Sequence, residues 1–229
     1  EEKRGVSSPV ILPDIALLDA ELTLGLPPSI TAATGVDAMV HAIEAYASVS
    51  ANNNPLSRML AREALRLLGA NIETAVSDGG NVAAREAMLL GSMLAGQAFA
   101  NSPVAAVHAL AYPVGGIFHI PHGLSNALVL TAVLRFNLPA AAPIYAEIAA
   151  DAFPHLADVP DESRAEAFVA ALQGLIGKLQ MPPRLRDVEI PAEALPRMAA
   201  EAMKQQRLLV NNPRPVTEAD ALAIYSEAW

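Results

Sequence analysis

The sequence predicts an all-α protein with a short extended segment at its N-terminus. Beyond Leu26, the residues alanine, leucine, methionine and glutamate dominate, and all four have high helix propensity. Turn-forming stretches such as SANNNP, SDGGN and NNPRP separate the periodic segments. No run of alternating apolar residues, the pattern of a half-buried strand, occurs beyond Leu22. These observations favour a helical body over a sheet.

Each predicted helix follows from the hydrophobic period and from the residues that start or stop it. Pro27 and Pro28 open the first helix, because proline fits the first turn of a helix but not its interior. Pro113 and the two glycines after it indicate the end of the fourth helix. Thr217, followed three residues later by an aspartate, is an N-cap signature for the last helix. The expected helices are 29–48, 55–77, 81–100, 104–112, 123–136, 140–152, 161–179, 191–203 and 217–227.

The first part of the chain differs in character from this helical body. Its apolar residues from Val10 to Leu18 are typical of a strand, yet the sequence offers no neighbouring strand with which it can pair. We therefore expect residues 1–25 to be a connecting strand segment and residues 26–229 to be one helical domain. The opening stretch also lacks a methionine, so we expect the chain to be part of something longer.

Composition excludes several classes of function. With 229 residues, 53% of them hydrophobic, the chain can bury a sizeable core. A formal net charge of -9 argues against nucleic acid or an anionic membrane surface as a partner. The absence of cysteine excludes disulfides, thiolate metal sites and cysteine nucleophiles. We find neither a bilayer-spanning apolar run nor a leader peptide, and we therefore expect a cytoplasmic protein.

A polar stripe runs along the first predicted helix. Thr34, Asp37, His41 and Glu44 are spaced by three, four and three residues, which places them on one helix face. A solvated face or a surface ion pair explains such a stripe without any chemistry. A catalytic or metal-binding interpretation needs further polar groups from elsewhere in the chain.

Three more histidines lie close together in the segment VHALAYPVGGIFHIPHGLSNA. His108, His119 and His122 fall within fifteen residues, in a chain that contains five histidines. An aspartate and three imidazoles can bind a divalent metal without any thiolate. The spacing does not decide between His119 and His122, since either could reach the same ion. His155 lies in a polar loop and is expected to be exposed.

Other catalytic motifs have little support. The chain has no GxGxxG, no GxxxxGK[ST] and no GxSxG elbow. Arg214 could bind an anion, but an exposed loop arginine is the simpler interpretation.

The sequence resembles the iron-containing, or group III, alcohol dehydrogenases. The resemblance spans essentially the whole chain, and two segments are the most specific: LPDIALLDAELTLGLPPSITAATGVDAMVHAIEAY and VHALAYPVGGIFHIPHGLSNALVL. It implies a helical C-terminal domain related to that of dehydroquinate synthase. It also implies that residues 1–25 connect to a nucleotide-binding domain that this chain does not contain.

The resemblance further implies a metal site and a reaction. Its motifs assign the metal to Asp37, His41, His108 and His122. Many family members carry a histidine beside the nicotinamide where this chain has Tyr112, which is the candidate catalytic residue here. The implied cofactors are Fe(II), with zinc also compatible, and NAD or NADP. The implied substrate is a small alcohol or aldehyde, and the implied assembly is a homo-oligomer.

Two alternatives to a nicotinamide-dependent dehydrogenase stay open. One is a non-catalytic helical remnant or oligomerisation module that keeps the fold. The other is a metallohydrolase that uses the same four ligands and a bound water, although no general-base motif favours it.

Overall fold

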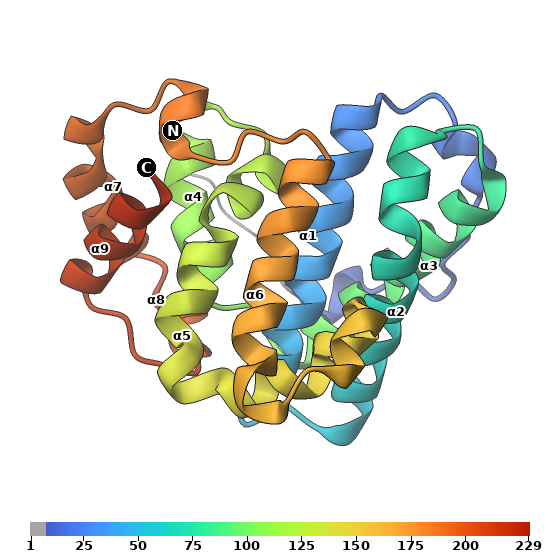
Figure 1. Cartoon of the computed structure of the whole chain (residues 1–229), viewed down its shortest axis with the longest axis horizontal. Helices are drawn as coiled ribbons and strands as arrows, with labels where there is room; N and C mark the ends of the chain where they lie inside the picture. Colours follow the sequence, from blue (N-terminus) through green and yellow to red (C-terminus); the bar gives the residue numbers. More distant parts are fainter. Residues whose placement is uncertain (1–7) are drawn as a thin grey trace.

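The computed structural model of the protein describes residues 8–229, most of which form α-helices (Figure 1). These residues contain no strand, which confirms the predicted all-α class. The helices are α1 (Pro28–Ala47), α2 (Pro55–Ser77), α3 (Val82–Asn101), α4 (Ala106–Phe118), α5 (His122–Ala152), α6 (Asp161–Lys178), α7 (Leu195–Ala202), α8 (Gln206–Leu209) and α9 (Glu218–Ala228). Short 3-10 helices lie at Pro9–Ile11, Ala20–Thr23, Pro154–Asp158, Leu185–Val188 and Ala192–Ala194.

Helix α1 passes through the middle of the molecule, with α2 and α3 on one side and α4 and α5 on the other (Figure 1). It contacts α2, α3 and α5 directly. Its many alanines allow this close packing because they present small side chains on every face. From Thr31 to Ala47, all but three residues are buried, and the three are Thr34, Asp37 and His41. The central helix therefore has a single polar opening.

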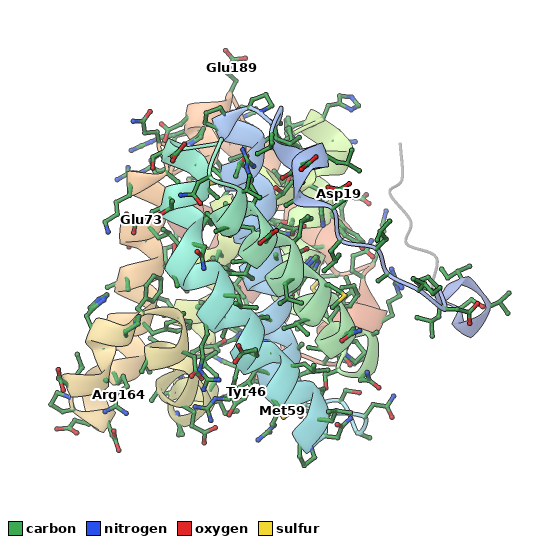
Figure 2. The ribbon with its side chains drawn as sticks, turned by 90° about the vertical axis from the view of Figure 1, so that its right-hand side faces the viewer. Asp19, Tyr46, Met59, Glu73, Arg164 and Glu189 are labelled. Atoms are coloured by element: carbon green, nitrogen blue, oxygen red, sulfur yellow. The ribbon has the colours of Figure 1, made fainter. Side chains whose placement is uncertain are left out.

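The segment formed by residues 8–18 leads away from the helical body, as Figure 2 shows. Its apolar side chains are exposed, with Val10 at 91%, Ile15 at 83% and Leu17 at 88% of their full accessibility. The predicted strand from Val10 to Leu18 is not formed: Pro9–Ile11 is a 3-10 turn instead, and the next residues pair with no other backbone segment that the structure describes. A strand needs a hydrogen-bonding neighbour, and the described residues supply none.

Two helices continue through prolines that the sequence suggested would end them. Helix α4 continues past Pro113 and both glycines to Phe118, where the sequence predicts an end at residue 112. Helix α5 contains Pro139 and Pro143, and it unites the two helices predicted at 123–136 and 140–152. The sequence showed no apolar run long enough to span a membrane, but α5 is long and apolar enough by length and composition. Half of the tested stretch is buried, and α5 packs against α1, α4 and α6, so its composition is that of a core helix.

In both proline-containing helices, a side chain from the C-terminal part of the chain donates a hydrogen bond to a carbonyl in the turn before a proline. Proline removes a backbone hydrogen bond and disturbs the turn before it. The buried Tyr225 hydroxyl on α9 donates to the Leu110 carbonyl at 2.6 Å, three residues before the proline in α4. Arg214 donates from Nη1 to the Phe136 carbonyl at 2.7 Å, again three residues before a proline, and stacks over the Phe136 ring. Arg214 is thus half-buried and structural, not the exposed loop residue that the sequence suggested.

In the C-terminal part of the chain, the predicted start of α9 is correct, whereas the helix predicted before it differs from the structure. The predicted capping pair forms at the start of α9, where Thr217 and Asp220 make reciprocal hydrogen bonds. The helix predicted at 191–203 is a 3-10 turn followed by α7, and α8 was not predicted at all.

Two glycines allow α5 to approach its neighbours closely. A Cβ atom on Gly123, at the start of α5, would lie 2.3 Å from the Ala33 carbonyl oxygen of α1. A Cβ atom on Gly69 of α2 would lie 2.1 Å from the Ala152 carbonyl oxygen at the other end of α5. Both contacts are with backbone, which cannot rotate away. Glycine is therefore required for helix contact at each end of α5.

Candidate metal centre

The predicted polar stripe on α1 divides into parts with different surroundings. Thr34 is exposed, and its hydroxyl donates to the Ile30 carbonyl at 2.8 Å within the same helix. Asp37 and His41, one turn apart, are partly buried. Glu44 is 5% exposed and lies inside the protein. Of the four residues in the stripe, Asp37 and His41 are the two candidate metal-binding side chains that lie on the partly exposed face of α1.

The other two candidate ligands come from the starts of α4 and α5. His108 lies in the first turn of α4 and is 3% exposed. His122 is the first residue of α5, directly after Pro121, and its side chain is 33% exposed. Pro121 predicts the helix start at His122, whereas His108 was expected in the middle of a helix at 104–112 and lies in the first turn because α4 begins at Ala106. Gly123 then holds this end of α5 against α1.

The four residues converge on one point. Asp37, His41, His108 and His122 each offer one ligand atom, and these atoms all lie within 4.8 Å of one another. The Asp37 Oδ1 atom is 3.8 Å from Nε2 of His108 and 3.7 Å from Nε2 of His122. Ligands bound tetrahedrally to a divalent ion at 2.0–2.2 Å lie roughly 3.4 Å apart. The two Asp37 distances need to shorten by a few tenths of an ångström, and the widest pair by up to roughly 1.4 Å, for the four groups to bind one divalent cation.

Aromatic stacking fixes the imidazole rings. The His41 ring lies between Phe99 of α3 and His108, with centroid separations of 4.7 and 4.8 Å and interplanar angles of 28° and 18°. Burial lowers the pKa of His41 from 6.5 to about 4, although the Asp37 carboxylate acts in the opposite direction. The imidazole is therefore neutral at pH 7, which is the form that binds a metal.

His119 lies apart from this cluster. It ends α4 in a left-handed conformation with φ of 58°, and its side chain is exposed. It lines a separate surface depression with Arg197 and Glu201. Of the two histidines that the spacing left open, the structure brings His122 to the other three candidate ligands. His155 is exposed, as expected.

Tyr112 lies beside the candidate site without being one of its four ligands. It follows His108 by one turn on α4, and its ring centroid is 6.3 Å from that of His122. It is half-buried. The phenol therefore lies next to the His122 side of the centre.

Three surrounding side chains were not assigned a role from the sequence. The Asn126 amide nitrogen donates to Asp37 Oδ1 and lies 3.3 Å from His108 Nε2 and 3.4 Å from His122 Nε2. Its position four residues after His122 was a signal that could have found it. Glu44 carried a signal as part of the polar stripe, whereas nothing in the sequence indicated Phe99.

Comparisons with known proteins agree with this architecture. A family model described as "Fe-containing alcohol dehydrogenase family, C-terminal" matches residues 31–229. Long-chain-alcohol dehydrogenase 1 of Geobacillus thermodenitrificans (strain NG80-2) is 40% identical over 224 residues, which are 98% of this chain and 56% of the relative. The chain spans about half the length of the curated relatives it matches.

Solved structures show the same similarity. The crystal structure of a 1,3-propanediol oxidoreductase superimposes with a TM-score of 0.87 at 38% identity, covering 92% of this chain and 55% of that protein. Sulfoacetaldehyde reductase from Bifidobacterium kashiwanohense, solved in complex with NAD+, gives a TM-score of 0.80 at 29% identity, with coverages of 92% and 53%. The chain belongs to the Fe-containing alcohol dehydrogenase family, and its match is to the C-terminal region of that family.

Proposed function

We propose that this chain supplies the metal-binding part of a nicotinamide-dependent alcohol dehydrogenase. The observation that carries the proposal is the convergence of Asp37, His41, His108 and His122 within 4.8 Å, from three separate helices. The proposed cation is Fe(II), in keeping with the family, and zinc suits the same ligands. The NAD+ complex of the sulfoacetaldehyde reductase supports a nicotinamide as the second cofactor. The reduction assay with NADH and with NADPH distinguishes NAD from NADP as the cofactor.

The protein groups around the centre have distinct tasks in this proposal. When bound there, a divalent cation would supply the Lewis acidity that stabilises negative charge on the oxygen of an alcohol or aldehyde. Phe99 and the buried His108 close one side of the centre against water. Asp37 and His122, at 16% and 33% side-chain exposure, mark the open side. Substrate therefore approaches past these two residues.

Tyr112 is the proposed catalytic side chain next to this open side. Its ring lies 6.3 Å from that of His122, so it lines the path that the substrate takes. Replacing Tyr112 by phenylalanine should reduce turnover while leaving the metal content unchanged. A variant with unaltered turnover would remove this residue from the mechanism.

Metal analysis tests the centre directly. The chain, stripped with a chelator and reloaded anaerobically with Fe(II) or with Zn²⁺, should hold about one ion per chain. His108→Ala should hold little, whereas His119→Ala, the matched control, should bind like the wild type. Full metal content in His108→Ala would refute the assigned ligand set.

Redox activity is tested separately. Reduction of short aldehydes by NADH and by NADPH should depend on the bound metal, measured on the full reading frame that encodes this chain. Metal binding without any nicotinamide-linked activity would favour the metallohydrolase, and loss of both would favour a structural remnant. Gel filtration tests the homo-oligomer, and cell fractionation tests the cytoplasmic location, both of which we include in the proposal.

A further inference from the structure

We propose that Glu44 is a positioning residue that fixes the tautomer of His108 for metal binding. This inference rests on the proposed metal site and adds a role for a residue that is not one of its ligands. Glu44 lies on α1, seven residues after Asp37, and is 5% exposed. Burying a carboxylate costs free energy unless hydrogen bonds satisfy its oxygens, so the hydrogen-bond partners of Glu44 indicate its role.

Both oxygens of Glu44 have a partner on α4. Oε1 accepts a hydrogen bond from the backbone N–H of Val107 at 2.6 Å. Oε2 lies 2.7 Å from Nδ1 of His108. Val107 is in the first turn of α4, where the N-cap residue Ala105 provides no side-chain hydrogen bond. Glu44 therefore satisfies a free N–H at the start of α4 and fixes the neighbouring ring at the same time.

The first of these two bonds shows that Glu44 acts as an acceptor. A backbone N–H can only donate, so Oε1 must accept from Val107. In the proposed arrangement Oε2 accepts as well, so His108 carries its proton on Nδ1 and donates it to Oε2 across 2.7 Å.

Asn126 gives independent support from the opposite side of the ring. Its amide nitrogen lies 3.3 Å from His108 Nε2, and an amide nitrogen only donates. The reversed amide would bring Oδ1 against the Asp37 carboxylate oxygen, which is the hydrogen-bond partner of Nδ2. Of the two hydrogens on Asn126 Nδ2, one is directed at Asp37 and the other is shared between Nε2 of His108 and Nε2 of His122, which favours an unprotonated Nε2 on His108.

The consequence is an imidazole that is ready to bind a metal. The Nε2 atom of His108 lies 3.8 Å from Asp37 Oδ1, inside the ligand cluster, and its lone pair is available there. A carboxylate on the far nitrogen also strengthens the imidazole as a ligand, and losing such a partner usually costs 10- to 100-fold in metal affinity.

Glu44→Gln tests this role with almost no change in volume. A glutamine can keep its oxygen on Val107 only by turning its NH₂ group toward His108 Nδ1. The proton of His108 then moves to Nε2, where it blocks the lone pair. The opposite orientation of the amide would place two donors, the NH₂ group and the Val107 N–H, against each other. Either way, we expect a roughly 10- to 100-fold increase in the Kd for Zn²⁺, measured by competition with a chelator.

The tautomer itself provides a second readout that a purely structural role would not change. Long-range ¹H–¹⁵N NMR of the ¹⁵N-histidine-labelled, metal-free chain should show His108 protonated on Nδ1 in the wild type and on Nε2 in Glu44→Gln. Thr217→Ala is the control, because it removes the N-cap of α9, away from the site, at a cost of about 1 kcal/mol in stability. This control should alter neither the tautomer nor the Kd.

Each outcome decides one part of the proposal. A wild-type chain that binds no Zn²⁺ would overturn the metal site itself. A wild-type chain that binds Zn²⁺, together with a Glu44→Gln variant of equal affinity, would overturn only the role of Glu44. If Glu44→Gln does not fold, the wild-type spectrum still decides, since a proton on Nε2 of His108 would refute the inference.

Discussion

Replacing Gly123 by alanine should damage the metal site through backbone displacement alone. The added Cβ would lie 2.3 Å from the Ala33 carbonyl oxygen and 2.6 Å from the Ala33 carbonyl carbon. Ordinary contact begins near 3.4 Å, so α1 and the start of α5 must separate by about 1 Å. His122 precedes Gly123, and Asp37 lies on the helix that is pushed away. Metal–ligand distances tolerate only about 0.2 Å, so this displacement withdraws a ligand.

Two measurements separate this effect from general destabilisation. Overpacking should lower the unfolding free energy by about 1–3 kcal/mol, measured by urea denaturation. The Kd for Zn²⁺ should rise by at least about tenfold, measured by chelator competition. Gly69→Ala makes an equally close backbone contact at the far end of α5, where a Cβ would lie 2.1 Å from the Ala152 carbonyl oxygen. Equal Zn²⁺ affinity in the Gly123→Ala and Gly69→Ala variants, at similar losses of stability, would refute the reasoning.

Three further predictions concern stability. Burial lowers the pKa of His41 to about 4, so between pH 6.5 and 4 the unfolded chain binds a proton that the folded, metal-free chain does not. The unfolding free energy should therefore fall by about 1.4 kcal/mol per pH unit on acidification through this window. Urea denaturation of His41→Gln at several pH values should lack this contribution to the pH dependence of the unfolding free energy. Asn126→Asp replaces the donor to Asp37 with a like charge, so the metal-free chain should lose about 1–3 kcal/mol, and saturating Zn²⁺ should restore much of it in a thermal melt. Tyr225→Phe removes the side-chain donor to the Leu110 carbonyl and should cost about 0.5–1.5 kcal/mol in urea denaturation. An unchanged midpoint would show that the turn before Pro113 does not need this bond.

The convergence of the candidate ligands could be anticipated in part from sequence because some of their placement is local. A spacing of four residues places Asp37 and His41 on one face of a helix, whatever surrounds that helix. Pro121 places His122 at a helix start, and His108 lies in the first turn of α4. The spacing alone left His119 and His122 open, and the family resemblance assigned His122. In the structure, His119 is the left-handed residue after α4, and its side chain lies away from the cluster.

The prolines show where local reasoning fails. A proline within a helical pattern predicts an end, because it removes a hydrogen bond and crowds the preceding turn. In α4 and α5, donors from residues more than seventy positions away support the turns before Pro113 and Pro139. These long-range bonds come from Tyr225 and Arg214, and no local window of sequence contains them.

The role of Glu44 could be predicted from sequence in part only, because it depends on both local spacing and tertiary contacts. Its place on the polar stripe followed from the helical period. Its burial, and its contact with both Val107 and His108, depended on the docking of α4 against α1. That tertiary contact turns a residue that looked solvent-facing into a buried acceptor.

The contribution of three helices to one centre links metal concentration to folding. Asp37 and His41 are four residues apart, but His108 and His122 follow more than sixty residues later, so an extended chain cannot gather all four. A cation that binds only the folded chain stabilises it by mass action, by about 2.7 kcal/mol when the free ion is at one hundred times its Kd. With a cation bound at the proposed site, the melting temperature would rise with the supply of free ion, and a chelator would remove this stabilisation.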